Sequence, residues 1–199
     1  MYSINFSKTG GPEVLKYEKL SISEPKENEV LIKHSAIGLN FIDTYHRSGL
    51  YPVPLPSGIG LEGAGIIEKV GPGVKNFKEG DFVEGRTGWQ DNPTVHENKL
   101  RLIDPSMAPL STAIGVLGMP GTTAYVGMKN FAKPQSGETL VVSAASGAVG
   151  GTVGQIGKIR RVKTAVLVKN KAVESPEGIV SEPISEEDKE KIEYCFSKY

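Results

Sequence analysis

A strand, a glycine-containing turn and a helix follow one another in the second half of the chain, and this order constrains the fold more than any other feature. Residues 139–143 (TLVVS) form a continuous β-prone run, which is typical of a strand covered on both faces. The turn at 144–150 (AASGAVG) follows directly. Apolar residues then recur at helical spacing, at Val149, Val153 and Ile156. With a second β-prone run at 163–168, the order predicts a β-α-β unit.

The turn has the layout of a dinucleotide-binding turn. Ala145 stands where the first glycine of G-x-G-x-x-G usually lies, Gly147 would let the backbone approach a pyrophosphate, and Gly150 would let the helix pack closely on the strand. The N–H groups and the positive dipole end of a helix that begins here suit an anion. We therefore predict a cofactor site at Ser146, Gly147, Ala148, Val149 and Gly150. The alternative is an ordinary turn without a ligand.

The residues after the second β-prone run bear on the choice of cofactor. An NAD site needs an Asp or Glu about 20 residues beyond the last glycine, to bind the ribose hydroxyls. This chain has Lys169, Asn170 and Lys171 there. Basic residues suit a 2′-phosphate, so we predict NADP as the cofactor, with Lys169 as a contact. The alternative is that these lysines belong to a solvated loop.

The N-terminal part has a different character. From Met1 to about Leu110 short β-rich runs, such as 30–34 and 64–70, alternate with glycine and proline turns, which predicts an antiparallel, barrel-like module. Residues 111–129 are expected to form two helical pieces, broken at 118–121 by Pro120. We predict a first domain over residues 1–115 and a second over 116–199.

Composition excludes several classes of protein. The 199 residues carry 23 Lys+Arg and 23 Asp+Glu, without the basic surplus expected of a nucleic-acid-binding protein. Cys195 is the single cysteine, so an internal disulfide framework and a cysteine zinc cluster are excluded. No apolar run has the roughly 18 residues of a membrane span, and the N-terminus lacks the apolar core of a signal peptide. We expect a cytoplasmic protein that does not contact membranes.

Several long motifs resemble the zinc-independent medium-chain dehydrogenases/reductases. Those in the N-terminal part resemble the NADPH-quinone oxidoreductase (zeta-crystallin) branch, and are GGPEVL at 10–15, AIGLNFIDTY at 36–45, RSGLY at 47–51 and GLEGAG at 60–65. Those in the middle part resemble the alkenal and curcumin reductase branch, and are GWQ at 88–90, GMPGTTAY at 118–125 and VSAASGAVG at 142–150. From Val162 onward the chain no longer resembles the family.

The resemblance implies a GroES-like β-barrel domain followed by a Rossmann-like parallel sheet, and hydride transfer from NADPH to a quinone or an α,β-unsaturated carbonyl. It also implies that Asn40, Tyr45 and Tyr51 line the nicotinamide and substrate pocket. Thr123 matches a position at the nicotinamide end, with Tyr125 as a nearby substrate-side candidate. The alternative for the two tyrosines is that they only pack the barrel.

No metal is expected. Leu61 stands where zinc-dependent relatives have a histidine, and the four-cysteine zinc lobe of those relatives is absent from the sequence. The three histidines show no ligand spacing, and we interpret them as surface or packing residues: His34, His46 and His96.

The length limits the second domain. A dinucleotide fold has two βαβαβ halves, and only 49 residues follow Gly150, so the Rossmann-like part is predicted to be truncated. A capping-box-like start at 185–188 predicts a C-terminal helix that either covers a sheet edge or packs on a second subunit in a homodimer. Two functions stay open: an NADPH-dependent reductase, or a catalytically silent truncated or fused reductase that acts as a binding or oligomerisation module.

Overall fold

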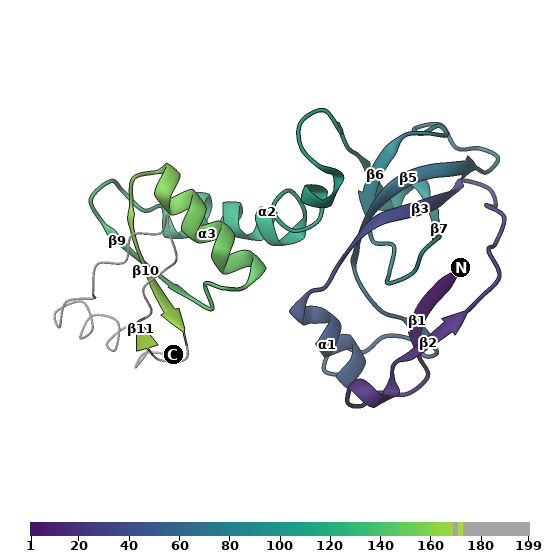
Figure 1. Cartoon of the computed structure of the whole chain (residues 1–199), viewed down its shortest axis with the longest axis horizontal. Helices are drawn as coiled ribbons and strands as arrows, with labels where there is room; N and C mark the ends of the chain where they lie inside the picture. The colour runs from purple at the N-terminus through teal and green to yellow at the C-terminus, as the bar shows by residue number, and fades with distance from the viewer. Residues whose placement is uncertain (169–170, 173–199) are drawn as a thin grey trace. The chain divides into compact units, whose positions relative to one another are not determined.

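The computed structural model describes residues 1–168 and 171–172, with side chains as far as Thr164 (Figure 1). Its contacts divide the chain into two units, Met1–Gly118 and a second unit that begins at Met119. The predicted C-terminal helix, Cys195 and Lys169 lie outside the described residues.

The first unit is built on a five-stranded antiparallel sheet. Its strand order is β7-β3-β5-β6-β8. The strands are β3 (Glu29–Gly38), β5 (Glu62–Val70), β6 (Phe82–Gly85), β7 (Thr94–His96) and β8 (Leu100–Leu102). The buried core of this sheet consists of Val30, Ile32, Ile67 and Val83. The β-rich runs predicted at 30–34 and 64–70 are therefore confirmed, and they form the central antiparallel pair β3–β5.

A smaller sheet lies in the same unit. It has the order β2-β1-β4, with β1 (Tyr2–Phe6), β2 (Lys16–Lys19) and β4 (Ser57–Gly58), and a 3-10 turn, η1 (Pro12–Val14), joins β1 to β2. Phe6, Val14 and Ile59 form its core. Trp89 links the two sheets because its N–H donates to Ile59 O (2.7 Å), its carbonyl accepts from Ile4 N–H (3.0 Å), and its indole N–H donates to Gly38 O (3.0 Å).

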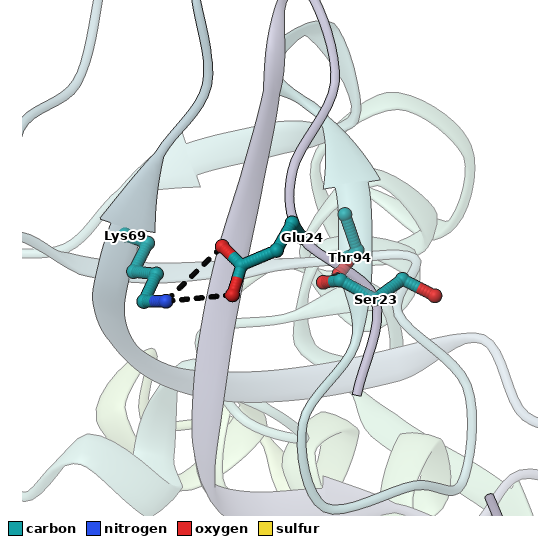
Figure 2. Close-up of polar contacts among 4 residues, drawn as sticks. All are labelled: Ser23, Glu24, Lys69 and Thr94. Atoms are coloured by element: carbon teal, nitrogen blue, oxygen red, sulfur yellow. Dashed lines mark hydrogen bonds and ion pairs between the residues drawn. The ribbon is translucent and has the colours of Figure 1, made fainter. Parts of the chain in front are cut away.

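The segment between β2 and β3 has no regular structure, yet it is attached to the large sheet. Figure 2 shows that Lys69 of β5 reaches both carboxylate oxygens of Glu24, at 2.8 and 3.0 Å. The Thr94 hydroxyl of β7 donates to Ser23 O at 3.0 Å. The ion pair is exposed and contributes little to stability by itself. Two adjacent residues of the segment are thus held to two strands that lie on either side of β3.

One helix in this unit was not predicted. The sequence indicated only strands and turns before Leu110, and this is wrong for α1 (Phe41–Ser48). The backbone N–H of Asn40, the residue before the helix, donates to the Asp43 carboxylate at 2.8 Å. The helix ends at Gly49, whose φ of 86° is left-handed. Asn before the helix, Asp three residues later and Gly after it are the usual signals of helix ends, and they were present in the sequence.

The second unit contains the predicted β-α-β order. β9 (Thr139–Ser143) leads through the turn into α3 (Ala148–Ile159), which leads back to β10 (Lys163–Val168). β10 pairs parallel to β9, and the short β11 (Lys171–Ala172) pairs antiparallel to β10. A large antiparallel sheet followed by a small sheet that contains a parallel β9–β10 pair confirms the predicted α/β plus β fold class.

The helical stretch before β9 differs from the prediction. A 3-10 turn, η3 (Leu110–Ala113), ends well before α2 (Met119–Val126), and a π-helical turn, η4 (Gly127–Ala132), continues α2. Pro120 was expected to break a helix, but it is the second residue of α2. A proline fits there because the first turn of a helix has no acceptors for its N–H groups. In the described part of the chain, no helix has both the length and the apolar character needed to cross a bilayer.

The core of the large sheet gives a stability prediction. Ile67 is 1% exposed, whereas Leu102, in the strand next to β6, is 59% exposed. Ile67→Ala should lower the free energy of unfolding by about 2–5 kcal/mol, because it removes buried methyl groups and leaves a cavity. Leu102→Ala, the control, should change it by less than about 0.5 kcal/mol. Urea unfolding followed by the fluorescence of Trp89 measures both. Equal effects of the two substitutions would contradict this assignment of the core.

Candidate functional site

The site residues predicted from the sequence fall into two groups, one in each unit. Asn40, Tyr45 and Tyr51 belong to the first unit, at and after the N-terminus of α1. Thr123 lies in α2, and residues 146–150 form the turn and the start of α3, all in the second unit.

Asn40 lies beside a buried carboxylate at the end of the β3–β5 pair. The register places Gly38, the last residue of β3, opposite Glu62, the first residue of β5. Two residues after Gly38, the side-chain amide of Asn40 donates through Nδ2 to Glu62 Oε2 at 2.8 Å. Glu62 is 4% exposed. The strand register therefore brings the predicted site residue against an acidic side chain 22 positions along the chain.

A second buried carboxylate, that of Asp43, also contacts Asn40. Asp43 is 1% exposed, and its Oδ2 accepts the backbone N–H of Asn40, while its Oδ1 has no hydrogen-bond partner in the described part of the chain. Burial raises the pKa of Asp43, and the negative charge of Glu62 adds to this, while the Asn40 N–H and His46 act in the opposite direction. Sequence reasoning did not single out Asp43 or Glu62 as site residues. Both lie within the motifs that carry the family resemblance, and that was the available signal.

The two tyrosines form a row of aromatic rings with Phe41. The Phe41 and Tyr45 rings lie edge to face with centroids 5.3 Å apart, and the Tyr45 and Tyr51 rings do the same at 5.1 Å. The Tyr51 N–H donates to Tyr45 O at 3.2 Å, which holds the two residues together. Tyr45 is half-buried, and the rings of Phe41 and Tyr51 are exposed. The row offers an apolar surface of tilted rings with phenolic tips on the two tyrosines. That it lines a substrate pocket stays a prediction.

Two of the three histidines, His34 and His96, have hydrogen-bond partners. His34 Nδ1 lies 2.5 Å from Gln90 O and Nε2 lies 2.7 Å from the Thr87 hydroxyl, and burial lowers the pKa of His34 against the opposing effects of Gln90 and Asp91. Its neutral form, with Nδ1 protonated toward the Gln90 carbonyl, satisfies both contacts. His96 Nδ1 accepts the N–H of Asn98 at 3.2 Å. Among the residues whose placement is described, no three His, Cys, Asp or Glu side chains group closely enough to hold a metal ion.

In the second unit, the turn before α3 presents backbone N–H groups. The Gly147 N–H donates to Ala144 O at 2.9 Å, and the first helical bond of α3 runs from Gly151 N–H to Gly147 O at 2.8 Å. The N–H groups of residues 148–150 precede that bond, so they have no acceptor within the helix. No side chain caps this helix end, and residues 146–149 are exposed. This end of α3 is therefore available to an anion.

Gly150 allows α3 to lie close to the turn that follows β9. A Cβ on Gly150 would lie 2.5 Å from Ala144 O and 2.7 Å from Ala145 Cα, so only glycine fits this helix–turn contact. The sequence predicted close packing of the helix on the strand at Gly150, and the close contacts are with the turn that follows β9. The left-handed residue of the turn is Ala144, with φ of 50°, one position before the residue that replaces the first glycine of the motif. An alanine in this conformation is strained.

The remaining predicted contact is Thr123. It is exposed on α2, and its hydroxyl donates to Met119 O, one turn back, at 2.8 Å. Its oxygen can still accept a hydrogen bond from a ligand. Tyr125 is also exposed, with the Lys129 ammonium 5.3 Å from its ring centroid. Contact of either residue with a cofactor stays a prediction.

Comparison with known proteins decides the family. Residues 26–133 match the alcohol dehydrogenase GroES-like domain. The chain belongs to the medium-chain dehydrogenase/reductase family. This member is 44% identical over 152 residues to a quinone oxidoreductase of Pseudomonas aeruginosa, covering 74% of this chain and 46% of that protein. It is 37% identical over 155 residues to the NADPH-dependent curcumin reductase of Escherichia coli, covering 75% of this chain and 44% of that protein.

Solved structures give the same family. The Escherichia coli quinone oxidoreductase in complex with NADPH matches with a TM-score of 0.74 and 37% identity, over 83% of this chain and 52% of that one. The resemblance to the quinone oxidoreductase and curcumin reductase branches is therefore confirmed. The chain spans about half the length of the curated relatives it matches.

The strained turn before α3 gives a second stability prediction. Ala144→Gly should stabilise the second unit by about 0.5–1 kcal/mol, because relief of the left-handed strain exceeds the entropy that glycine adds to the unfolded chain. Gln155→Gly, on the exposed side of α3, should destabilise it by about 1 kcal/mol. Hydrogen exchange of the α3 amides measures both changes. Faster exchange in Ala144→Gly would show that this residue is not strained.

Asp43 gives a prediction for pH dependence. Because its pKa is raised above the ordinary value of 3.8, the folded chain binds this proton more tightly than the unfolded chain does. The contribution of Asp43 to stability is therefore complete below pH 3.8 and is lost as the pH rises through the raised pKa. Relative to Asp43→Asn, the wild type should lose stability as the pH rises from 3.8 through the raised pKa of Asp43. Urea titrations at a series of pH values measure this.

Asp81 is the control with the opposite sign. The Lys78 N–H lowers its pKa, so its contribution is present above pH 3.8 and is lost as the pH falls through the lowered pKa. Relative to Asp81→Asn, the wild type should gain stability as the pH rises. If the stability difference between wild type and variant changed with pH in the same direction for both residues, the assignment for Asp43 would be refuted.

Proposed function

We propose that this chain binds NADPH at the N-terminus of α3 and takes part in hydride transfer to a quinone or an α,β-unsaturated carbonyl. The observation that carries the proposal is the exposed turn at 146–149, where the first N–H groups of α3 have neither a helical acceptor nor a side-chain cap. The names of the relatives support the cofactor and the two classes of electron acceptor, a quinone oxidoreductase and an NADPH-dependent curcumin reductase among them.

The residues of the second unit fit a dinucleotide. The amides of Ala148, Val149 and Gly150 would hold the diphosphate, with Ser146 and Gly147 beside it, and the close approach at Gly150 keeps α3 directed at that position. Lys169 would contact the 2′-phosphate, and Thr123 the nicotinamide end. Bound NADPH supplies the hydride, while the protein orients the reactants and excludes water.

The first unit would supply the acceptor side of the reaction. The carboxamide of Asn40 would donate a hydrogen bond to the carbonyl oxygen of the substrate, and Tyr45 and Tyr51 would provide apolar contact for its ring or conjugated chain. A reduced quinone can take its proton from solvent, so this chemistry does not require a general acid from the protein.

A second candidate function is supported by a separate observation. Among the described strands, parallel pairing is limited to β9 and β10, which is a single β-α-β unit rather than the two halves of a dinucleotide fold. Such a unit can hold the diphosphate and the 2′-phosphate without holding nicotinamide. The chain would then be a catalytically silent binding module. Within the described residues β9 has a strand neighbour on one side only, and an open edge of this kind suits association into a homodimer.

Thermal melting with three ligands tests both functions. The melting temperature should rise more with NADPH and with 2′-phospho-ADP-ribose than with NADH. A free ligand concentration of 100 times the Kd corresponds to about 2.7 kcal/mol of stabilisation. Ala148→Asp should abolish the rise, because it places a negative charge at the exposed helix start. Gln155→Asp introduces the same charge seven residues later and should leave the rise in melting temperature unchanged.

The outcomes separate the two functions. Oxidation of NADPH by a quinone in the presence of the chain supports the reductase. A shift with 2′-phospho-ADP-ribose but no oxidation supports the binding module. Absence of a shift with every ligand would rule out both.

A further inference from the structure

The Glu62 carboxylate occupies a space that two glycines leave open for it. A Cβ on Gly38 would lie 2.7 Å from Glu62 Oε2 and 2.8 Å from Glu62 Cβ. A Cβ on Gly118 would lie 2.5 Å from Glu62 Oε1. These glycines are 80 positions apart in the sequence, yet each makes room for one oxygen of the same buried side chain. The carboxylate is therefore held on both sides by backbone, which allows it little freedom to turn.

A carboxylate in this place selects one orientation of the Asn40 side chain. A carboxamide has a donating edge and an accepting edge, whereas a carboxylate only accepts hydrogen bonds. With Nδ2 of Asn40 2.8 Å from Glu62 Oε2, the donating edge must face Glu62. The backbone of Asn40 is held separately, through its N–H to Asp43. Two acidic residues thus hold Asn40, one by its main chain and one by its side chain.

We propose that Glu62 is a positioning residue, which orients the Asn40 carboxamide so that its second Nδ2 hydrogen donates to the carbonyl oxygen of a quinone or enone. The inference rests on the proposed function for the identity of that acceptor. The orientation of Asn40 itself rests on the contact with Glu62 and on the glycines around it. A hydrogen bond to a charged group is stronger than one between neutral groups, so Glu62 favours this orientation by about tenfold or more over the flipped one.

The chain contains a matched pair for comparison. Glu68, on the same strand β5, accepts a hydrogen bond from Nδ2 of Asn92 at 3.2 Å, and Glu68 is exposed. The two pairs have the same chemistry and differ in burial and in the surrounding backbone. Glu68→Gln is therefore the control for Glu62→Gln.

Side-chain amide signals in a ¹⁵N-labelled sample of the full chain test the positioning. In the wild type, the Asn40 Nδ2 hydrogens should exchange with water at least about tenfold more slowly than those of Asn92, and one of them should show a nuclear Overhauser contact to the Glu62 methylenes. Glu62→Gln should remove most of that difference, while Glu68→Gln should leave the Asn40 signals unchanged. Unaltered Asn40 signals in Glu62→Gln would overturn the proposal. If that variant does not fold, equal exchange of Asn40 and Asn92 in the wild type overturns it.

A titration with menadione, a small quinone, in the presence of NADPH separates the positioning from the proposed function. A shift of the Asn40 amide signals in the wild type, with affinity at least about tenfold weaker in Glu62→Gln, supports both. A shift with equal affinity in the two proteins overturns the positioning alone. If menadione shifts no Asn40 signal while Glu62→Gln still alters the exchange, the proposed substrate is wrong and Glu62 only orients Asn40.

Discussion

The antiparallel pairing of β3 with β5 is the constraint on which the first unit depends. Its register joins Val30 to Val70 at one end and Gly38 to Glu62 at the other. A shift by one residue would turn every side chain of a strand to the opposite face, so the register determines both the apolar core at Ile32 and Ile67 and the position of Glu62 beside Asn40. Trp89, bonded to both sheets and to Gly38 O, attaches the smaller sheet to the same end of this pair. Core and candidate site are thus two consequences of one alignment.

In the second unit, backbone geometry has the corresponding role. Gly150 allows α3 to approach the turn after β9 more closely than any side chain would permit, and the strained Ala144 reverses the chain in front of the helix. The result is a helix start whose first N–H groups have no acceptor within the helix and which follows an exposed turn at 146–149. Because the backbone supplies these groups, an anion site of this kind depends on glycine positions rather than on charged side chains, which agrees with the neutral composition of the chain.

The family comparison and the strand topology each support one of the two proposed functions. The GroES-like match at residues 26–133 and the likeness to a quinone oxidoreductase solved with NADPH support the proposed reductase. Among the described strands parallel pairing is limited to β9 and β10, which supports the proposed binding without turnover. The two proposed functions share the diphosphate contact and differ at the nicotinamide. The buried acidic pair around Asn40 belongs to the first unit alone, so its geometry does not depend on which of the two functions holds.

The sequence by itself determined the features that depend on neighbouring residues. The β-prone run at 139–143, the glycine spacing of the turn and the helical period after it predicted β9, α3 and their order, because each is encoded within a few positions. The ends of α1 were encoded locally as well, by Asn40, Asp43 and Gly49, although only the structure made this evident. The contact between Asn40 and Glu62 was decided by the tertiary structure, since 22 residues separate them and only the strand register brings them together. Burial of Asp43 was decided in the same way, because the pKa of a carboxyl group depends on what packs around it rather than on its neighbours along the chain.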